Sequence, residues 1–101
     1  MRVIVLIRPT NRHGTKGSYT SFRKLLTAEG FVFVQPEVFM LATPTRRSAE
    51  AALSRIANAV PTTGTVCALL LTERQIASIR YLVGEKPYQE QAVGAKRLVT
   101  L

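Results

Sequence analysis

The acidic side chains are the first residues to consider for chemistry, because metal-assisted phosphodiester hydrolysis needs several carboxylates around one or two cations. The chain contains no aspartate, and all six of its carboxylates are glutamates: Glu29, Glu37, Glu50, Glu73, Glu85 and Glu90. Glu73 has the position of a helix-start carboxylate, and only Glu37 falls beside an expected sheet. We expect no catalytic residue and no metal ligand here, and an ion pair with a neighbouring arginine is the expected role of Glu37.

The single histidine, His13, is the only candidate general base near neutral pH. It lies in a polar, glycine-containing loop at 10–17, together with Arg12 and Lys16. No serine, cysteine or carboxylate stands at a fixed short spacing to orient it, so no catalytic triad is indicated. A phosphate contact is the expected role of this loop.

Basic residues outnumber acidic ones and indicate an anionic partner. Fourteen lysines and arginines against six acidic residues give a formal net charge of +8, spread along the chain rather than gathered in one run. This pattern is typical of a folded basic surface that binds a phosphate backbone, although a charge that only prevents aggregation is the alternative. The expected DNA contacts lie at element ends: Arg12, His13, Lys16, Arg46, Arg47 and Arg74.

The elements that must position these residues follow from apolar spacing. Continuous apolar runs at Val3–Ile7 and Val66–Leu71 predict buried strands, and Phe31–Gln35 with Val38–Ala42 predicts a hairpin turned at Pro36-Glu37. Apolar residues at helical spacing predict one helix that is capped by Ser18 and stops at Gly30, and a second from Ser48 towards Val60. Phe33 and Phe39 are expected in the core rather than as base-stacking platforms.

The predicted fold class is α+β, a ferredoxin-like βαββαβ arrangement with an antiparallel four-stranded sheet. Because the first and fourth strands lack apolar and polar alternation, the sheet face away from the helices should also be covered. We therefore expect a homodimer packed sheet to sheet.

The last 29 residues are ambiguous in their periodicity. A helical turn at Glu73–Ala77 followed by a fifth strand to Val83, ended by Gly84, is the preferred interpretation. Residues 1–84 then form the ferredoxin-like domain, and residues 85–101 form a C-terminal tail or strand for dimer or other partner contact, with 96–101 an edge strand or docked tail.

The lone Cys67 lies in an apolar run, which excludes an internal disulfide and favours a buried, inert thiol. The five apolar residues before Arg8 are too few for a signal peptide, and no stretch has the ~20 apolar residues of a membrane span. A cytoplasmic protein with no membrane partner is expected.

Three segments together resemble one known family. They read G-F-V-F-V-Q-P-E-V-F at 30–39, N-A-V-P-T-T-G-T-V-C-A-L-L-L-T-E-R-Q at 58–75 and S-I-R-Y-L-V-G-E at 78–85. The chain resembles CRISPR-associated protein two, the small subunit of the spacer-acquisition machinery, and T-E-R-Q with L-V-G-E looks like the branch beside single-protein effector (type II) systems.

The resemblance implies a ferredoxin-like homodimer held between two dimers of the CRISPR integrase, supporting the middle of a double-stranded protospacer. The tail at 85–101 would then serve for dimer or integrase contact. Some members are described as metal-dependent nucleases that use an aspartate at the end of the first strand. Here the corresponding position is Ile7 or Arg8, which cannot bind a divalent cation, and Arg8 would instead favour phosphate.

Three functional hypotheses follow from these residues. The first is a non-catalytic adaptor that needs no cofactor and binds DNA through Arg8 and the basic residues named above. The second is a metal-dependent endonuclease, the only case in which Mg²⁺ is expected. The third is a ferredoxin-like module that binds a ligand or another protein.

Overall fold

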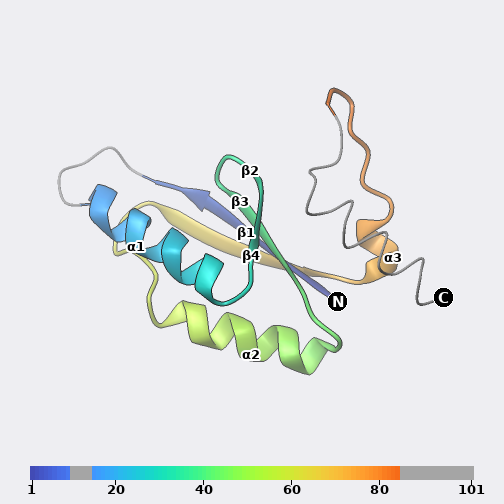
Figure 1. Cartoon of the computed structure of the whole chain (residues 1–101), viewed down its shortest axis with the longest axis horizontal. Coiled ribbons are helices and arrows are strands. Elements are labelled where there is room, and N and C mark those ends of the chain that lie inside the picture. Colours follow the sequence, from blue (N-terminus) through green and yellow to red (C-terminus); the bar gives the residue numbers. More distant parts are fainter. Residues whose placement is uncertain (10–14, 85–101) are drawn as a thin grey trace.

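Four strands and two long helices follow one another in the order expected for a split βαβ arrangement (Figure 1). The computed structural model describes residues 1–9 and 15–84. The elements are β1 (Arg2–Arg8), α1 (Thr15–Ala28), β2 (Val32–Gln35), β3 (Val38–Ala42), α2 (Arg46–Ala57), β4 (Thr65–Leu71) and α3 (Glu73–Ile76). The α+β class with an antiparallel four-stranded sheet is confirmed.

The strands are ordered β2-β3-β1-β4, so β1 is central and pairs antiparallel with both β3 and β4. Its first residue, Arg2, lies opposite Ala42 and Leu71, and its last, Arg8, lies opposite Thr65. The register puts the end of β3, the end of β4 and the start of β1 at one end of the sheet. The end of β1 and the start of β4 form the other end.

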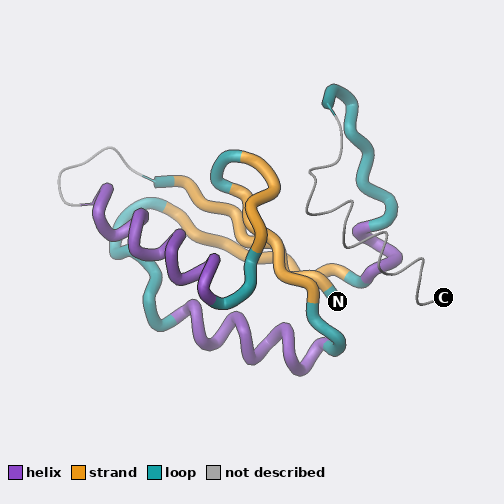
Figure 2. Tube along the Cα trace, viewed as in Figure 1, coloured by secondary structure: helices purple, strands orange, loops and turns teal. Residues whose placement is uncertain are grey.

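Both long helices cover the same face of the sheet (Figure 2). The core beneath them contains alternate residues of β1, namely Val3, Val5 and Ile7, packed against Phe22 and Leu26 of α1 and Ala49 and Ile56 of α2. The remaining β1 side chains point to the opposite face because strand residues alternate. We call that opposite surface the open face.

Two helix starts differ from the expected positions. α1 begins at Thr15, so Ser18 lies inside the helix and is not its cap. α2 begins at Arg46, and its cap is Thr45, whose Oγ1 accepts a hydrogen bond from the Ser48 amide at 3.1 Å. The Thr45 amide in turn donates a hydrogen bond to Ser48 Oγ, which completes a capping box. α2 ends at Ala57, so Val60 lies beyond it.

The β2–β3 hairpin turns at Pro36-Glu37, as expected, and Glu37 has a left-handed φ of 67°. Its carbonyl oxygen accepts a hydrogen bond from the Ile7 amide at 2.9 Å. Its carboxylate receives the Arg23 guanidinium of α1, with Nη2 to oxygen distances of 2.6 and 2.8 Å. The predicted ion pair of Glu37 is therefore confirmed.

Two predictions about the later part of the chain differ from the structure. β1 is buried as expected, but β4 lies at the edge of the sheet among the described strands, so Cys67, Ala68 and Leu69 are exposed in the single chain. The helical turn is present as α3, yet residues 77–84 contain no strand, so the fifth strand through Val83 is not formed in the described residues. Periodicity could not decide this point, because strand formation needs a partner edge. The tail at 85–101 lies outside the described residues.

Candidate functional site

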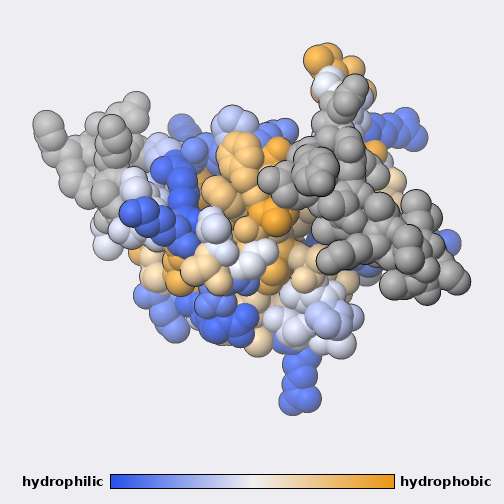
Figure 3. Space-filling view, in the orientation of Figure 1, coloured by the Kyte–Doolittle hydropathy of each residue, from blue (hydrophilic) through white to orange (hydrophobic). Residues whose placement is uncertain are grey.

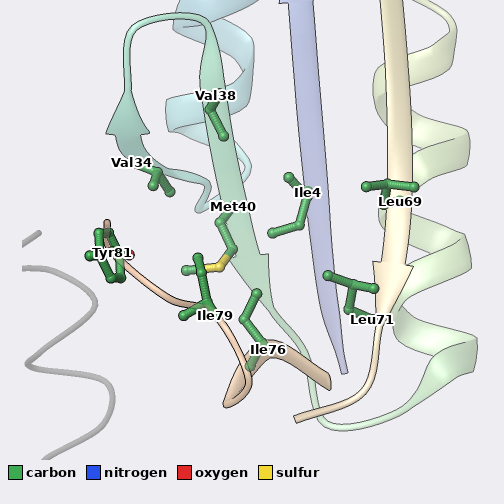
Figure 4. Close-up of a pocket in the computed structure, with 9 residues that line it drawn as sticks. All are labelled: Ile4, Val34, Val38, Met40, Leu69, Leu71, Ile76, Ile79 and Tyr81. Atoms are coloured by element: carbon green, nitrogen blue, oxygen red, sulfur yellow. The ribbon is translucent and has the colours of Figure 1, made fainter. Parts of the chain in front are cut away.

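The middle of the open face is apolar on all four strands, and Arg2 and Arg8 mark the two ends of this face on β1. Its rows follow from the register: Val38, Leu6 and Cys67 form one row, and Val32, Met40, Ile4 and Leu69 form the next. Between this face and the segment that follows β4 lies an apolar cavity of about 180 Å³ (Figure 4). Its lining residues are Ile4, Val34, Val38, Met40, Leu69, Leu71, Ile76, Ile79 and Tyr81.

The α3 segment covers only one corner of the open face. Ile76 is buried against Ile4 and Met40, but Leu69 remains 50% exposed and Ile79 46% exposed. Farther along the chain, Leu82 and Val83 are almost completely exposed and belong to a segment that projects from the body of the molecule (Figure 1). A surface with this much exposed aliphatic side chain is typical of a site that another protein surface covers.

An ion pair anchors α3 to the first strand. The Arg2 side chain is 1% exposed, and its Nε donates to Glu73 Oε2 at 2.9 Å and to Oε1 at 3.1 Å. The Met1 amine lies 3.2 Å from the same Oε2. Burial raises the pKa of Glu73, but the hydrogen bonds and positive charges of Arg2 and of the amine outweigh burial, so this pKa is lower than usual.

Cys67 lies on the open face and is exposed in the single chain, contrary to the expected buried thiol. The apolar run was identified correctly, but an edge strand has one neighbour rather than two, so half of its surroundings are missing. Only a covering surface on the open face would bury this thiol.

Arg8 is exposed and is the last residue of the central strand β1, at one of the two positions where the resemblance placed a metal-binding carboxylate. Tyr19 contacts the backbone here. Its hydroxyl donates a hydrogen bond to the Thr63 carbonyl at 2.6 Å and lies 3.4 Å from the Arg8 carbonyl oxygen. Gly64 (φ 80°) leaves room for this contact, because a Cβ atom there would meet the Tyr19 hydroxyl. The end of β1 therefore packs against Tyr19 of α1 and carries a cation.

The four glutamates of the described residues are each paired with arginine. Nitrogen to oxygen distances are 2.9 Å for Arg2–Glu73, 2.6 Å for Arg23–Glu37, 2.9 Å for Arg55–Glu29 and 4.0 Å for Arg46–Glu50. Within residues 1–9 and 15–84, no three histidine, cysteine or acidic side chains cluster at metal-binding spacing. This part of the chain does not fit a divalent-cation site, because hard cations need several carboxylate oxygens.

The predicted DNA contacts divide between the two ends of the sheet. Arg46 and Arg47 begin α2 just after β3, and Arg74 lies in α3 just after β4, so these three belong to the end where β1 starts. All three are exposed. Arg8 lies at the opposite end. Lys16 is in the first turn of α1, and Arg12 and His13 lie outside the described residues. One chain therefore does not gather these residues in one place.

Sequence reasoning missed two features of these surfaces. Arg2 was counted among the scattered surface charges, but it is a buried partner of Glu73, and the large separation of the two residues hid their contact. Phe33 was expected in the core, but it is 50% exposed, because β2 is the other edge strand. Its exposure could have been suspected only from the strand order.

No protein-family model matches the chain. Several curated proteins do, and each is named CRISPR-associated endoribonuclease Cas2. The protein from Ligilactobacillus salivarius is 32% identical over 102 residues, covering 100% of both chains. That from Lacticaseibacillus rhamnosus is 34% identical over 85 residues, covering 83% of this chain and 84% of the relative. That from Acidovorax ebreus is 30% identical over 99 residues, covering 97% of each.

Proposed function

The chain belongs to the Cas2 family of CRISPR-associated proteins, and we propose that it is a non-catalytic homodimeric adaptor of the CRISPR adaptation complex. In this role it bridges integrase dimers and supports the protospacer duplex while a new spacer is acquired. The observation that carries the proposal is the exposed Arg8 at the end of β1, together with the arginine pairing of all four described glutamates.

The homodimer forms through the open face. Its apolar rows and the exposed Leu69 support packing against a second copy, because burying such side chains contributes roughly 25 cal/mol per Å². The helices lie on the other face and would remain outside the interface (Figure 2). The projecting Leu82 and Val83 support a contact of residues 78–84, and of the tail at 85–101, with the partner copy or with the integrase.

Duplex binding depends on basic residues at the strand and helix ends. A two-fold axis doubles Arg8, Arg46, Arg47 and Arg74. It also doubles Lys16 in the first turn of α1, and Arg12 and His13, which precede that helix in the sequence. Such residues neutralise phosphates without reading bases, so affinity falls with salt by about 0.9 log unit per log unit for each phosphate contacted. A cytoplasmic location is part of this proposal.

Light scattering tests the dimer. The wild-type chain should have twice the mass of one subunit at micromolar concentration. Leu69→Glu, on the open face, should give a folded monomer because a buried carboxylate opposes association. Val60→Glu is the matched control, because Val60 is 44% exposed and lies beyond α2, away from that face. A wild-type monomer would contradict the dimer.

Fluorescence anisotropy with a fluorescent duplex tests the adaptor role. The double variant Arg46→Gln/Arg47→Gln should bind more weakly at low salt and lower the salt slope by about two units if both side chains contact phosphates. Co-purification with the integrase, with and without residues 85–101, locates the integrase contact. An unchanged slope and no integrase complex would refute the adaptor.

A metal-dependent endonuclease is the second candidate, because the relatives are named endoribonucleases. Purified protein incubated with RNA or duplex DNA and Mg²⁺ should give no cleavage. Magnesium-dependent cleavage that Glu37→Ala abolishes would favour the nuclease.

The branch of the family is also a proposal. Thr72-Glu73-Arg74-Gln75 and the L-V-G-E at 82–85 support an association with single-protein effector systems. A gene for such an effector beside this one would be the expected genomic neighbourhood.

A further inference from the structure

A groove lies on the helix side of the sheet, between α1 and the β2–β3 hairpin. It has a volume of about 570 Å³ and is lined by Thr20, Arg23, Lys24, Thr27, Phe33 and Phe39. The four α1 residues recur at helical spacing and form one polar wall, and the two phenylalanines form the other. Figure 3 shows apolar side chains over the hairpin beside hydrophilic ones over α1.

The aromatic wall presents a ring to solvent. Phe39 is 6% exposed and belongs to the core, whereas Phe33 is 50% exposed. The two rings meet edge to face, with centroids 5.8 Å apart and an interplanar angle of 79°. This contact favours one orientation of the Phe33 ring, which presents an aromatic surface at the groove.

The polar wall supplies positive charge. Arg23 Nη2 binds Glu37, which ties α1 to the hairpin turn, and the guanidinium lies 5.8 Å from the centre of the Tyr19 ring. No acidic side chain within residues 1–9 and 15–84 forms an ion pair with the exposed Lys24. The groove therefore combines an exposed aromatic ring with a cation that can bind an anion.

We propose that this groove binds an unpaired nucleotide, with the base stacked on Phe33 and its phosphate bound by Lys24. Stacking on an exposed ring together with a neighbouring positive charge is the usual basis of single-strand binding. An apolar peptide fits less well, because the α1 wall offers only hydroxyl and cationic side chains. The net charge of +8 also favours a polyanion.

The groove remains accessible when the open face is covered. Phe33 pairs with Phe39 in the register, whereas the neighbouring Val32 pairs with Met40 of the open face. The ring therefore points away from the proposed dimer interface. Single-strand binding at Phe33 adds a site that the duplex contacts do not include.

Fluorescence anisotropy with a short thymidine oligonucleotide tests the proposal. Phe33→Leu keeps an apolar side chain but removes the ring, and it should weaken binding roughly tenfold or more. Phe33→Tyr keeps the ring and should bind like wild type. A melting curve for each variant shows whether the fold is intact.

An abasic oligonucleotide of the same length and charge tests the stacking contact by changing the ligand instead of the protein. It should bind about tenfold more weakly than the thymidine oligonucleotide, and Phe33→Leu should not weaken it further. Lys24→Gln should weaken both oligonucleotides and lower the salt slope by about one unit or less.

Two results would overturn the proposal: equal affinity of wild type for the two oligonucleotides, or equal affinity of wild type and Phe33→Leu for thymidine. Blunt duplex binding, measured in parallel, should be the same for Phe33→Leu and wild type. If the wild-type protein does not bind the blunt duplex at all, this result would count against the adaptor role but not against the groove proposal.

Discussion

Replacing Glu73 with glutamine tests the ion pair that anchors α3 to β1. The change removes the negative charge beside the buried Arg2 but keeps one acceptor oxygen and nearly the same shape. Hydrogen bonds to charged groups contribute about 1.5–3 kcal/mol, so we expect a loss of about 2 kcal/mol in the free energy of unfolding at pH 7. For a chain of this size the corresponding fall in Tm is roughly 10 °C.

The pH dependence of this loss follows from the pKa of Glu73, which is lower in the folded protein than usual. A carboxyl with a lowered folded pKa stabilises the fold fully above its unfolded pKa, about 4.3 for glutamate. That stabilisation disappears as the pH falls through the lowered value. The difference in the free energy of unfolding between wild type and Glu73→Gln should therefore have its full size at pH 7 and should disappear in strong acid.

Urea unfolding at fixed protein concentration, followed by circular dichroism between pH 7 and pH 2, measures this difference. Glu50→Gln is the matched control, because the Glu50 side chain is 57% exposed and lies 4.0 Å from Arg46, and it should change stability by less than about 0.5 kcal/mol. A loss in Glu73→Gln that is as large in strong acid as at pH 7 would refute the charge-based reasoning.

Three further changes probe the strand end and the open face. Tyr19→Phe removes the hydroxyl that donates to the Thr63 carbonyl at 2.6 Å, and thermal melting should report a loss of about 1–2 kcal/mol. Gly64→Ala should cost about 3 kcal/mol, because φ is 80° and the new Cβ would meet both the Tyr19 hydroxyl and the Arg8 carbonyl. Only the part of this cost that comes from the hydroxyl should disappear in the Tyr19→Phe background, and strict additivity would contradict that contact. The Cys67 thiol should react slowly with a disulfide reagent in the wild-type dimer and quickly in monomeric Leu69→Glu, and equal rates would contradict burial of the open face.

Local patterns predicted most of the elements because their signals lie within a few residues. The apolar run of β1, the turn at Pro36-Glu37 and the start of α3 at Glu73 were all expected where the structure has them. The start of α1 was misplaced by four residues, because serine is a favoured capping residue type and Ser18 was taken as the cap, whereas the helix already begins at Thr15. Helix ends depend on single hydrogen bonds, and several nearby residues can supply them.

The sequence by itself determined the charge, the absence of aspartate, the fold class and the apolar character of β4. Tertiary structure alone decided that β4 and β2 are edge strands, and so left Cys67, Leu69 and Phe33 exposed. It also joined Arg2 to Glu73 across 71 positions of sequence. The physical reason is that composition and periodicity are properties of neighbouring residues, whereas exposure and long-range pairing depend on which strands and helices pack beside one another.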